Sequence, residues 1–279
     1  MHKNNLKNIL ITGCSSGIGL DVARGLRADG WRVFATARRS EDVASLVAEG
    51  FADALQLDVD DSDSIHAALA EVLRRTGGRL EALFNNAGFG QPGAAEDIPR
   101  HAMRAQFETN LFGAWELSNA VLAVMRRQGG GRILFNSSVL GFAAMRYRGA
   151  YNASKYAMEG LCDTLRLELA GSGIHVCLVE PGPIESRFRP NALQKFLANV
   201  DIDGSAHRAS YQQQLARLQK VGHAQPFTLP GTAVLAEVRK ALAARRPAAR
   251  YRVTFPTHLF WHLKWLLPTR WLDWVLGRV

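Results

Sequence analysis

The sequence predicts an α/β protein with one doubly wound parallel sheet and helices on both faces. Two observations lead to this prediction. From residue 8 to about residue 180, short apolar runs alternate with longer segments of helical periodicity, and no internal repeat or low-complexity segment interrupts them. In addition, the 279 residues are 47% hydrophobic and 21% charged, which is typical of a globular chain with a substantial core.

The elements follow in order along the chain. The first strand is predicted from Ile9, Leu10 and Ile11, and the first helix from Ile18, Val22 and Leu26 at helical spacing. Asn110 lies inside the longest helical pattern, where Asn is disfavoured, and it predicts a local irregularity or a buried polar task. The predicted strands are 8–12, 32–36, 54–57, 80–85, 132–136 and 175–179. The predicted helices are 17–29, 41–48, 62–75, 100–127 and 150–170.

A glycine-rich turn lies between the first strand and the first helix. Glycine permits positive φ in a tight turn and lets the backbone approach a phosphate, whose charge the amides and dipole of the next helix favour. The spacing is G-x-x-x-G-x-G and not the commoner G-x-G-x-x-G. We interpret it as a dinucleotide phosphate site, with an ordinary turn as the alternative. The candidate residues are Gly13, Ser15, Ser16, Gly17, Ile18 and Gly19.

The end of the second strand indicates which dinucleotide is bound. Arg38 and Arg39 follow this strand, and no acid occurs before Glu41. An NAD site usually has a carboxylate here for the ribose 2′-hydroxyl, whereas guanidiniums accommodate a 2′-phosphate. The pattern therefore predicts NADP(H). The alternative is that both arginines are solvated surface charges.

Two later loops are candidates for the adenosine side of the cofactor. Asp58 is placed to accept a hydrogen bond from an adenine amino group, or else it caps the helix that begins near Ser62. Asn86, Ala87 and Gly88 follow the fourth strand, where small residues let the chain pass close to a ribose and Asn side chains can bridge strand ends.

A tyrosine and a lysine form the candidate catalytic pair. Tyr151 and Lys155 are spaced i and i+4, so they share one face of a helix. A phenol has a pKa of about 10, and we expect the neighbouring ammonium to lower it toward the range useful for acid–base work. Hydride transfer from a nicotinamide to a carbonyl needs such a proton donor. Taken alone, the pair would more often be a surface pair without function.

Together, these motifs resemble the short-chain dehydrogenase/reductase family, whose members have a Rossmann-type sheet. The resemblance covers residues 8 to about 188, in the order and at the spacing of the family. It is carried by residues 12–19, 85–88, 110, 137–138, 151–155 and 181–184.

The resemblance implies a role for each matching residue. Tyr151 would exchange the proton, Lys155 would lower its pKa and bind the nicotinamide ribose, and Ser138 would hold the substrate oxygen. Asn110 would fix a water that links Lys155 to solvent. Asp58 and Val59 would meet adenine. Pro181, Gly182 and Ile184 would meet nicotinamide, although Ser186 stands where the family often has Thr.

The resemblance also suggests the substrate. Residues 36–38, 85–90 and 179–184 look like those of family members that reduce retinoids, steroids or long aldehydes, including bacterial NADP-dependent aldehyde reductases. Because cellular NADP is mostly reduced, we expect reduction of lipophilic aldehydes or ketones. The alternatives are an alcohol, retinol or steroid dehydrogenase working oxidatively, and a non-catalytic dinucleotide-binding regulator. A predicted apolar pocket uses Phe142, Met145, Tyr147, Phe188 and Phe196, with ordinary core packing as the alternative for each.

We expect one domain over residues 1–250, with a substrate lid at about 186–230. A basic, Trp-rich extension over 251–279, divided at Pro268, would pack on the same domain. Residues 239–279 hold nine Lys or Arg and one acid, nearly the whole excess of the net charge of +9. The body is thus close to neutral, which argues against a nucleic-acid-binding face. The extension would cover the cleft, join subunits of a dimer or tetramer, or rest on an anionic membrane surface.

The cysteines and the N-terminus indicate the compartment. Cys14, Cys162 and Cys177 have no paired or metal-ligand spacing, so no metal site is expected. Free cysteines fit a reduced, cytoplasmic location. Neither a signal peptide nor a membrane span is indicated.

Overall fold

The computed structural model describes residues 6–220, 222 and 226–278 and confirms the single parallel sheet. Its strand order is β3-β2-β1-β4-β5-β6-β7. Successive connections run outward in opposite directions from β1 and β4, so a crevice forms where the carboxyl ends of these two strands meet. The strands are β1 (Asn8–Ile11), β2 (Arg32–Ala37), β3 (Leu55–Gln56), β4 (Ala82–Asn85), β5 (Gly131–Asn136), β6 (Ile174–Glu180) and β7 (Arg250–Arg252).

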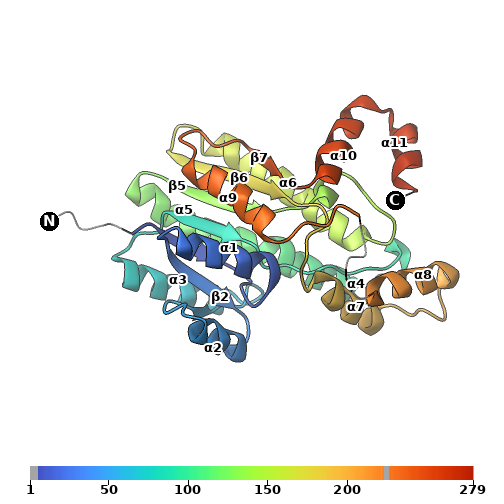
Figure 1. Ribbon diagram of the computed structural model, residues 1–279, viewed down its shortest axis with the longest axis horizontal. Coiled ribbons are helices and arrows are strands. Elements are labelled where there is room, and N and C mark those ends of the chain that lie inside the picture. Colours follow the sequence, from blue (N-terminus) through green and yellow to red (C-terminus); the bar gives the residue numbers. More distant parts are fainter. Residues whose placement is uncertain (1–5, 221, 223–225, 279) are drawn as a thin grey trace.

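Helices cover both faces of the sheet (Figure 1). Helices α3, α5 and α6 pack on one face, and α1 and α9 pack on the other. The helices are α1 (Gly17–Ala28), α2 (Ser40–Ala48), α3 (Ser62–Thr76), α4 (Arg100–Phe107), α5 (Gly113–Gln128), α6 (Gly149–Glu168), α7 (Phe188–Asn199), α8 (Arg208–Gln219), α9 (Thr232–Ala243), α10 (Phe255–Leu266) and α11 (Thr269–Leu276). Short turns are η1 (Ala95–Asp97), η2 (Glu108–Phe112) and η3 (Val139–Gly141).

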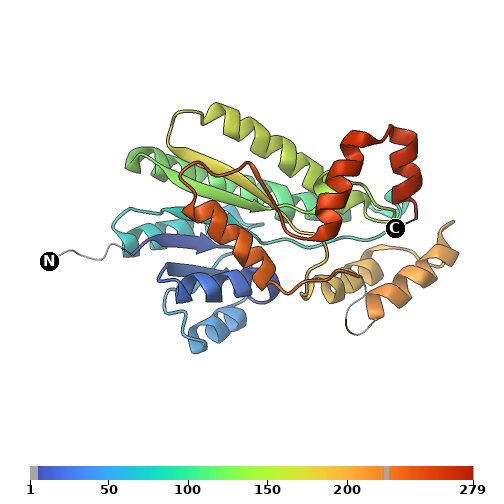
Figure 2. The same ribbon diagram turned by 45° about the horizontal axis from the view of Figure 1, so that its top comes forward.

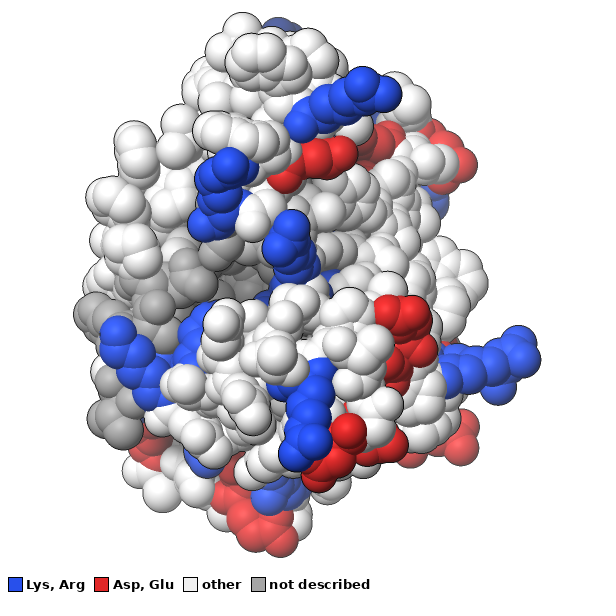
Figure 3. Space-filling model, turned by 90° about the vertical axis from the view of Figure 1, so that its right-hand side faces the viewer, with Lys and Arg blue, Asp and Glu red and all other residues white. Residues whose placement is uncertain are grey.

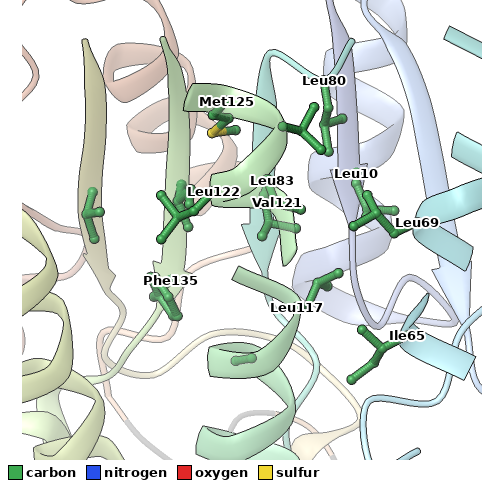
Figure 4. Packing of buried hydrophobic residues seen from close by; sticks show 14 of the residues in the cluster. Leu10, Ile65, Leu69, Leu80, Leu83, Leu117, Val121, Leu122, Met125 and Phe135 are labelled. Carbon is green, nitrogen blue, oxygen red and sulfur yellow. The ribbon is translucent and has the colours of Figure 1, made fainter. Parts of the chain in front are cut away.

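A buried apolar core between α5 and the sheet supports the crevice. Leu117 and Val121 on α5 lie over Leu83 of β4, and Leu10 of β1 contributes to the same cluster (Figure 4). A Cβ on Gly113, the first residue of α5, would lie 2.0 Å from the carbonyl oxygen of Val59. Only glycine fits this close approach, so α5 is held tightly against the loop that follows β3.

Two regions differ from the sequence prediction. The long helix predicted over 100–127 is divided into α4, the π-helical turn η2 and α5, with Asn110 inside η2 as the expected irregularity. Strand β7 was missed because Arg250, Tyr251 and Arg252 have no apolar strand pattern. It pairs with β6 and spans the predicted boundary at residue 250, so residues 251 and 252 belong to the sheet.

The segment predicted as a lid and the C-terminal helices lie at the same end of the sheet. Figures 1 and 2 show α7 and α8 on one side of that end and α10 and α11 on the other. Pro268 is the N-cap of α11 and divides the extension as predicted. Within the described residues, no helix is long and apolar enough to span a membrane.

Candidate active site

The turn between β1 and α1 has the shape that a phosphate cradle needs. Gly13 has a φ of +71°, and a Cβ there would lie 2.9 Å from the Cα of Ala87. A Cβ on Gly19 would lie 2.3 Å from the carbonyl oxygen of Gly13. Ser16 caps α1 without a side-chain hydrogen bond, and the first turn holds no acid. The first amides of α1 are thus left for an anion, and a dinucleotide pyrophosphate fits this turn.

Hydrogen bonds fasten this turn to the ends of β4 and β5. The Thr12 hydroxyl accepts from the backbone amides of Asn86 and Ala87, both at 2.9 Å. The Asn86 side chain donates to the carbonyls of Thr12 and Gly13 at 2.9 and 3.1 Å. It also accepts from Asn136 at 2.9 Å. The predicted bridging of strand ends by Asn is confirmed, and it holds the crevice in one shape.

The predicted adenosine-side residues lie at the ends of β2 and β3. Arg38 and Arg39 are both exposed, and the closest acid to Arg39 is Asp42 at 3.9 Å. Asp58 accepts from the backbone amide of Asp60 at 3.1 Å. The N-cap of α3 is Asp61, whose carboxylate accepts from two backbone amides of the first turn. The alternative that Asp58 caps this helix is therefore wrong. Val59 is buried.

Tyr151 and Ser138 meet in front of β5. Tyr151 lies in the first turn of α6, and Ser138 is the N-cap of η3. Burial raises the pKa of Tyr151 to about 12, and a hydrogen bond with Ser138 partly opposes this rise. The phenol is therefore neutral at physiological pH. A neutral phenol is the form that can donate a proton.

Lys155 lies one turn further along α6. Its Nζ donates to the carbonyl of Asn136 at 2.6 Å and lies 5.7 Å from the centroid of the Tyr151 ring. Burial lowers the pKa of Lys155 to about 8, and the charge of Glu159 opposes this. In this structure burial dominates the pKa of Tyr151 and the Nζ of Lys155 donates to Asn136, so a lowering of that pKa by Lys155 stays a prediction. The two side chains do share one face, as the spacing predicted.

Asn110 joins α6 to the loop after β4. Its side chain is buried, accepts from the Phe89 amide at 3.0 Å, and donates to the Phe89 carbonyl at 3.0 Å and to the Ser154 hydroxyl at 3.2 Å. A Cβ on Gly88 would lie 3.1 Å from its amide oxygen. These contacts position the neighbour of Lys155. A water held by Asn110 stays a prediction.

A pocket of about 950 Å³ opens in front of these residues. Met145, Tyr147 and Phe188 line it as predicted, but Phe142 and Phe196 do not, because they are buried in two separate apolar clusters. The C-terminal helices α10 and α11 contribute further walls, so the extension covers part of the cleft. The predicted site residues that line the pocket are Ile18, Asn86, Gly88, Ser138, Tyr151, Lys155, Pro181, Gly182 and Ile184. Apart from Ile18, the residues expected at the phosphates and adenine lie outside it, near the ends of β1 to β3.

A buried charge network behind the site was missed from sequence. Glu180, at the end of β6, is fully buried, and each of its oxygens lies 3.1 Å from a guanidinium Nε, of Arg250 and of Arg252. Arg250 also pairs with Glu159 at 3.0 Å, and Glu159 accepts from Ser137 at 2.5 Å. The signal that could have revealed this network is Glu180 itself, an acidic residue at the end of an otherwise apolar strand.

Comparison with known proteins agrees with this geometry. The family model described as short chain dehydrogenase matches residues 7–195. The chain is 42% identical over 270 residues to the uncharacterized oxidoreductase YbbO of Escherichia coli K12, covering 97% of this chain and 94% of that protein. It is 36% identical to human 17-beta-hydroxysteroid dehydrogenase type 1, covering 88% and 77% of the two chains.

The chain is also similar to a solved structure. An actinorhodin polyketide ketoreductase crystallised with NADPH matches at a TM-score of 0.74 and 30% identity, covering 91% of this chain and 97% of that one. The motifs, the fold and these relatives agree throughout the matched region. The chain therefore belongs to the short-chain dehydrogenase/reductase family of oxidoreductases.

Proposed function

We propose that the protein is an NADP(H)-dependent reductase of aldehyde or ketone groups in lipophilic substrates. The observation that carries the proposal is the neutral phenol of Tyr151, hydrogen-bonded to Ser138 and facing a pocket with both apolar and polar walls beside the glycine turn. A proton donor is what reduction of a carbonyl requires of the protein.

The side chains of the site would divide the work as follows. The nicotinamide supplies the hydride when the cofactor is bound. Ser138 and Tyr151 would both hydrogen-bond the carbonyl oxygen, and Tyr151 would transfer its proton to that oxygen as charge develops there. The ammonium of Lys155 would stabilise the phenolate left behind. Met145, Phe188 and Leu259 would exclude water from the reacting carbon.

Three observations support NADP(H) as the cofactor. Arg38 and Arg39 follow β2, and both side chains are exposed to an approaching phosphate. No acid occupies the end of β2, where a carboxylate would repel the 2′-phosphate. Moreover, the actinorhodin ketoreductase, at 30% identity, carries NADPH.

Reversing the charge of Arg38 tests this choice. We expect Arg38→Glu to lower the ratio of kcat/KM for NADPH to kcat/KM for NADH by about 10- to 100-fold. The variant loses a charge-assisted hydrogen bond to the 2′-phosphate, and the new carboxylate repels this phosphate. The measurement is NADPH and NADH oxidation with a panel of aldehydes and ketones of graded chain length. Arg126→Glu, an exposed position near the end of α5, makes the same change in net charge and should leave the ratio unaltered. A wild-type enzyme that prefers NADH would overturn the assignment.

The pKa of Lys155, about 8, predicts an alkaline limb in the pH profile. Reduction should slow as pH rises through this value, because a neutral amine cannot stabilise the phenolate. The charge of Glu159 is the main influence that raises this pKa, against the burial that lowers it. Glu159→Gln should therefore shift the limb to lower pH, whereas Glu168→Gln, exposed at the end of α6, should not. If the alkaline limb of Glu159→Gln lies at the same pH as in the wild-type protein, a group other than Lys155 causes it.

A further inference from the structure

Helix α8 turns a polar face toward the pocket. Its inner residues, Tyr211 and Leu218, are buried in the apolar cluster that contains Phe196. The Tyr211 hydroxyl hydrogen-bonds Asp97 and accepts from the Ala94 amide at 2.9 Å, which fixes the helix on the main domain. Leu218 reaches the edge of the pocket beside the polar pocket-lining residues of α8, which recur at i, i+3, i+4 and i+7. They are Ser210, Gln213, Gln214 and Arg217.

Arg217, at the end of this stripe, has no counter-charge within the part of the chain that the structure describes. Its side chain is half-buried, and its Nε is buried without a hydrogen-bond partner. It forms no ion pair with any residue in 6–220, 222 or 226–278. Burial lowers the pKa of its guanidinium, and no acid opposes the change. An unpaired, partly desolvated cation is costly, so it points to an anion that the protein receives from outside.

A second guanidinium, that of Arg148, contacts the same polar face of α8. Arg148 donates to the carbonyl of Tyr147 at 2.8 Å and to the amide oxygen of Gln214 at 3.2 Å, and Gln214 is one helical turn before Arg217. Arg146, Arg189 and Arg278 also line the pocket, against a single acidic residue, Glu185, among the lining residues that the structure describes. Figure 3 shows Lys and Arg side chains around the hollow on this face, and no acidic side chain is visible inside it.

The cofactor phosphates do not explain these two arginines. The residues expected to bind phosphates lie in the turn 12–19 and at Arg38 and Arg39. Of these, Ile18 alone lines the pocket. Arg217 and Arg148 come instead from the lid helix and from the loop before α6, on the substrate side. The anion therefore belongs to the substrate.

We propose that the substrate is an amphipathic carbonyl compound with an acidic group, such as a carboxylate, which Arg217 and Arg148 bind. This proposal rests on the proposed reductase function and names the substrate class of the same site. The apolar part of the substrate lies against Leu140, Phe188 and Leu259, which line the pocket together with the arginines. Guanidiniums suit the acid because they form charge-assisted, often bidentate, hydrogen bonds with carboxylates.

The kinetic test compares oxo-carboxylic acids of graded chain length with their methyl esters. Wild-type enzyme should use the best acid at least about tenfold better in kcat/KM than its ester. Arg217→Gln should raise KM for the acid by about tenfold or more and leave the ester within about twofold, while Arg217→Lys should recover part of the loss. Arg208→Gln, exposed and outside the pocket on the same helix, is the matched control.

A binding test does not depend on turnover. Titration of the full-length protein with decanoate and with methyl decanoate should show tighter binding of the acid, and Arg217→Gln should remove the difference. If acid and ester are reduced and bound equally well, the inference is wrong and the reductase function stands. If neither is reduced with NADPH or NADH but Arg217 still selects decanoate, the reductase function is wrong and the anion site stands.

Discussion

Tyr151→Phe is expected to lower kcat for NADPH-dependent carbonyl reduction by about 10²- to 10⁴-fold, the usual contribution of a positioned general acid. The phenol is neutral and hydrogen-bonded to Ser138, so under the proposed function its hydroxyl would donate the proton to the carbonyl oxygen. The ring remains in the variant and keeps its edge contact with Phe188, whose centroid lies 5.2 Å away. The dissociation constant of NADPH should therefore change little.

The control for this prediction lies five residues further along the same helix. Tyr156 is exposed and does not line the pocket, so Tyr156→Phe should retain wild-type activity. Both variants are assayed by NADPH oxidation with one aldehyde, and cofactor affinity is measured separately by fluorescence titration. Full activity in Tyr151→Phe would show that another group supplies the proton.

Glu180→Ala should have the largest effect on stability. The carboxylate is fully buried between Arg250 and Arg252, and its loss leaves Arg252 without an acidic partner among the described residues. Breaking a buried pair costs about 3 kcal/mol or more, which lowers Tm by roughly 6 to 12 °C in a chain of this size. Thermal unfolding at pH 8 measures this. Glu49→Ala removes a surface pair with Arg24 and should cost less than about 1 kcal/mol. A similar shift in both variants would contradict the account.

The same carboxyl group makes stability depend on pH. Burial raises the pKa of Glu180 to about 7, against about 4.3 in an unfolded chain. The folded protein therefore binds the proton of Glu180 more tightly than the unfolded chain does. The protonated carboxyl group makes its full contribution to the free energy of unfolding below about pH 4.3, and this contribution is lost as the pH rises through about 7. The ion pairs with Arg250 and Arg252 do not bring this pKa back to its usual value, because neither carboxylate oxygen of Glu180 accepts a well-aligned hydrogen bond from them. Glu180→Gln should remove this part of the pH dependence.

The fold was largely predictable because its elements carry local signals. Ile9 to Ile11 and the glycine turn mark a strand and a helix start, and Asn110 marked the π-helical turn correctly. Strand β7 gave no such signal, because Arg250 and Arg252 are held in the sheet by their ion pairs with Glu180, a partner some 70 residues away. A contact between distant segments cannot be inferred from local periodicity.

Sequence motifs indicated which residues line the crevice around Tyr151, but not their electrostatics or the substrate-side wall. Spacing placed Tyr151 and Lys155 on one face, yet the pKa of Tyr151 depends on how deeply the fold buries it. For the same reason Phe142 and Phe196 could not be assigned to pocket or core. The polar face of α8 could not be predicted either, because only the burial of Tyr211 in the apolar cluster shows which side of the helix meets the pocket.

Deuterium transfer tests the central claim, hydride transfer from a nicotinamide cofactor to a carbonyl carbon, most directly. The wild-type protein is incubated with an aldehyde and NADPH that carries deuterium on one face of C4 or on the other, and the alcohol is analysed by mass spectrometry. We expect one of the two cofactors to place a single deuterium on the former carbonyl carbon, and the other to place none. Alcohol that forms without deuterium from either cofactor would contradict the account.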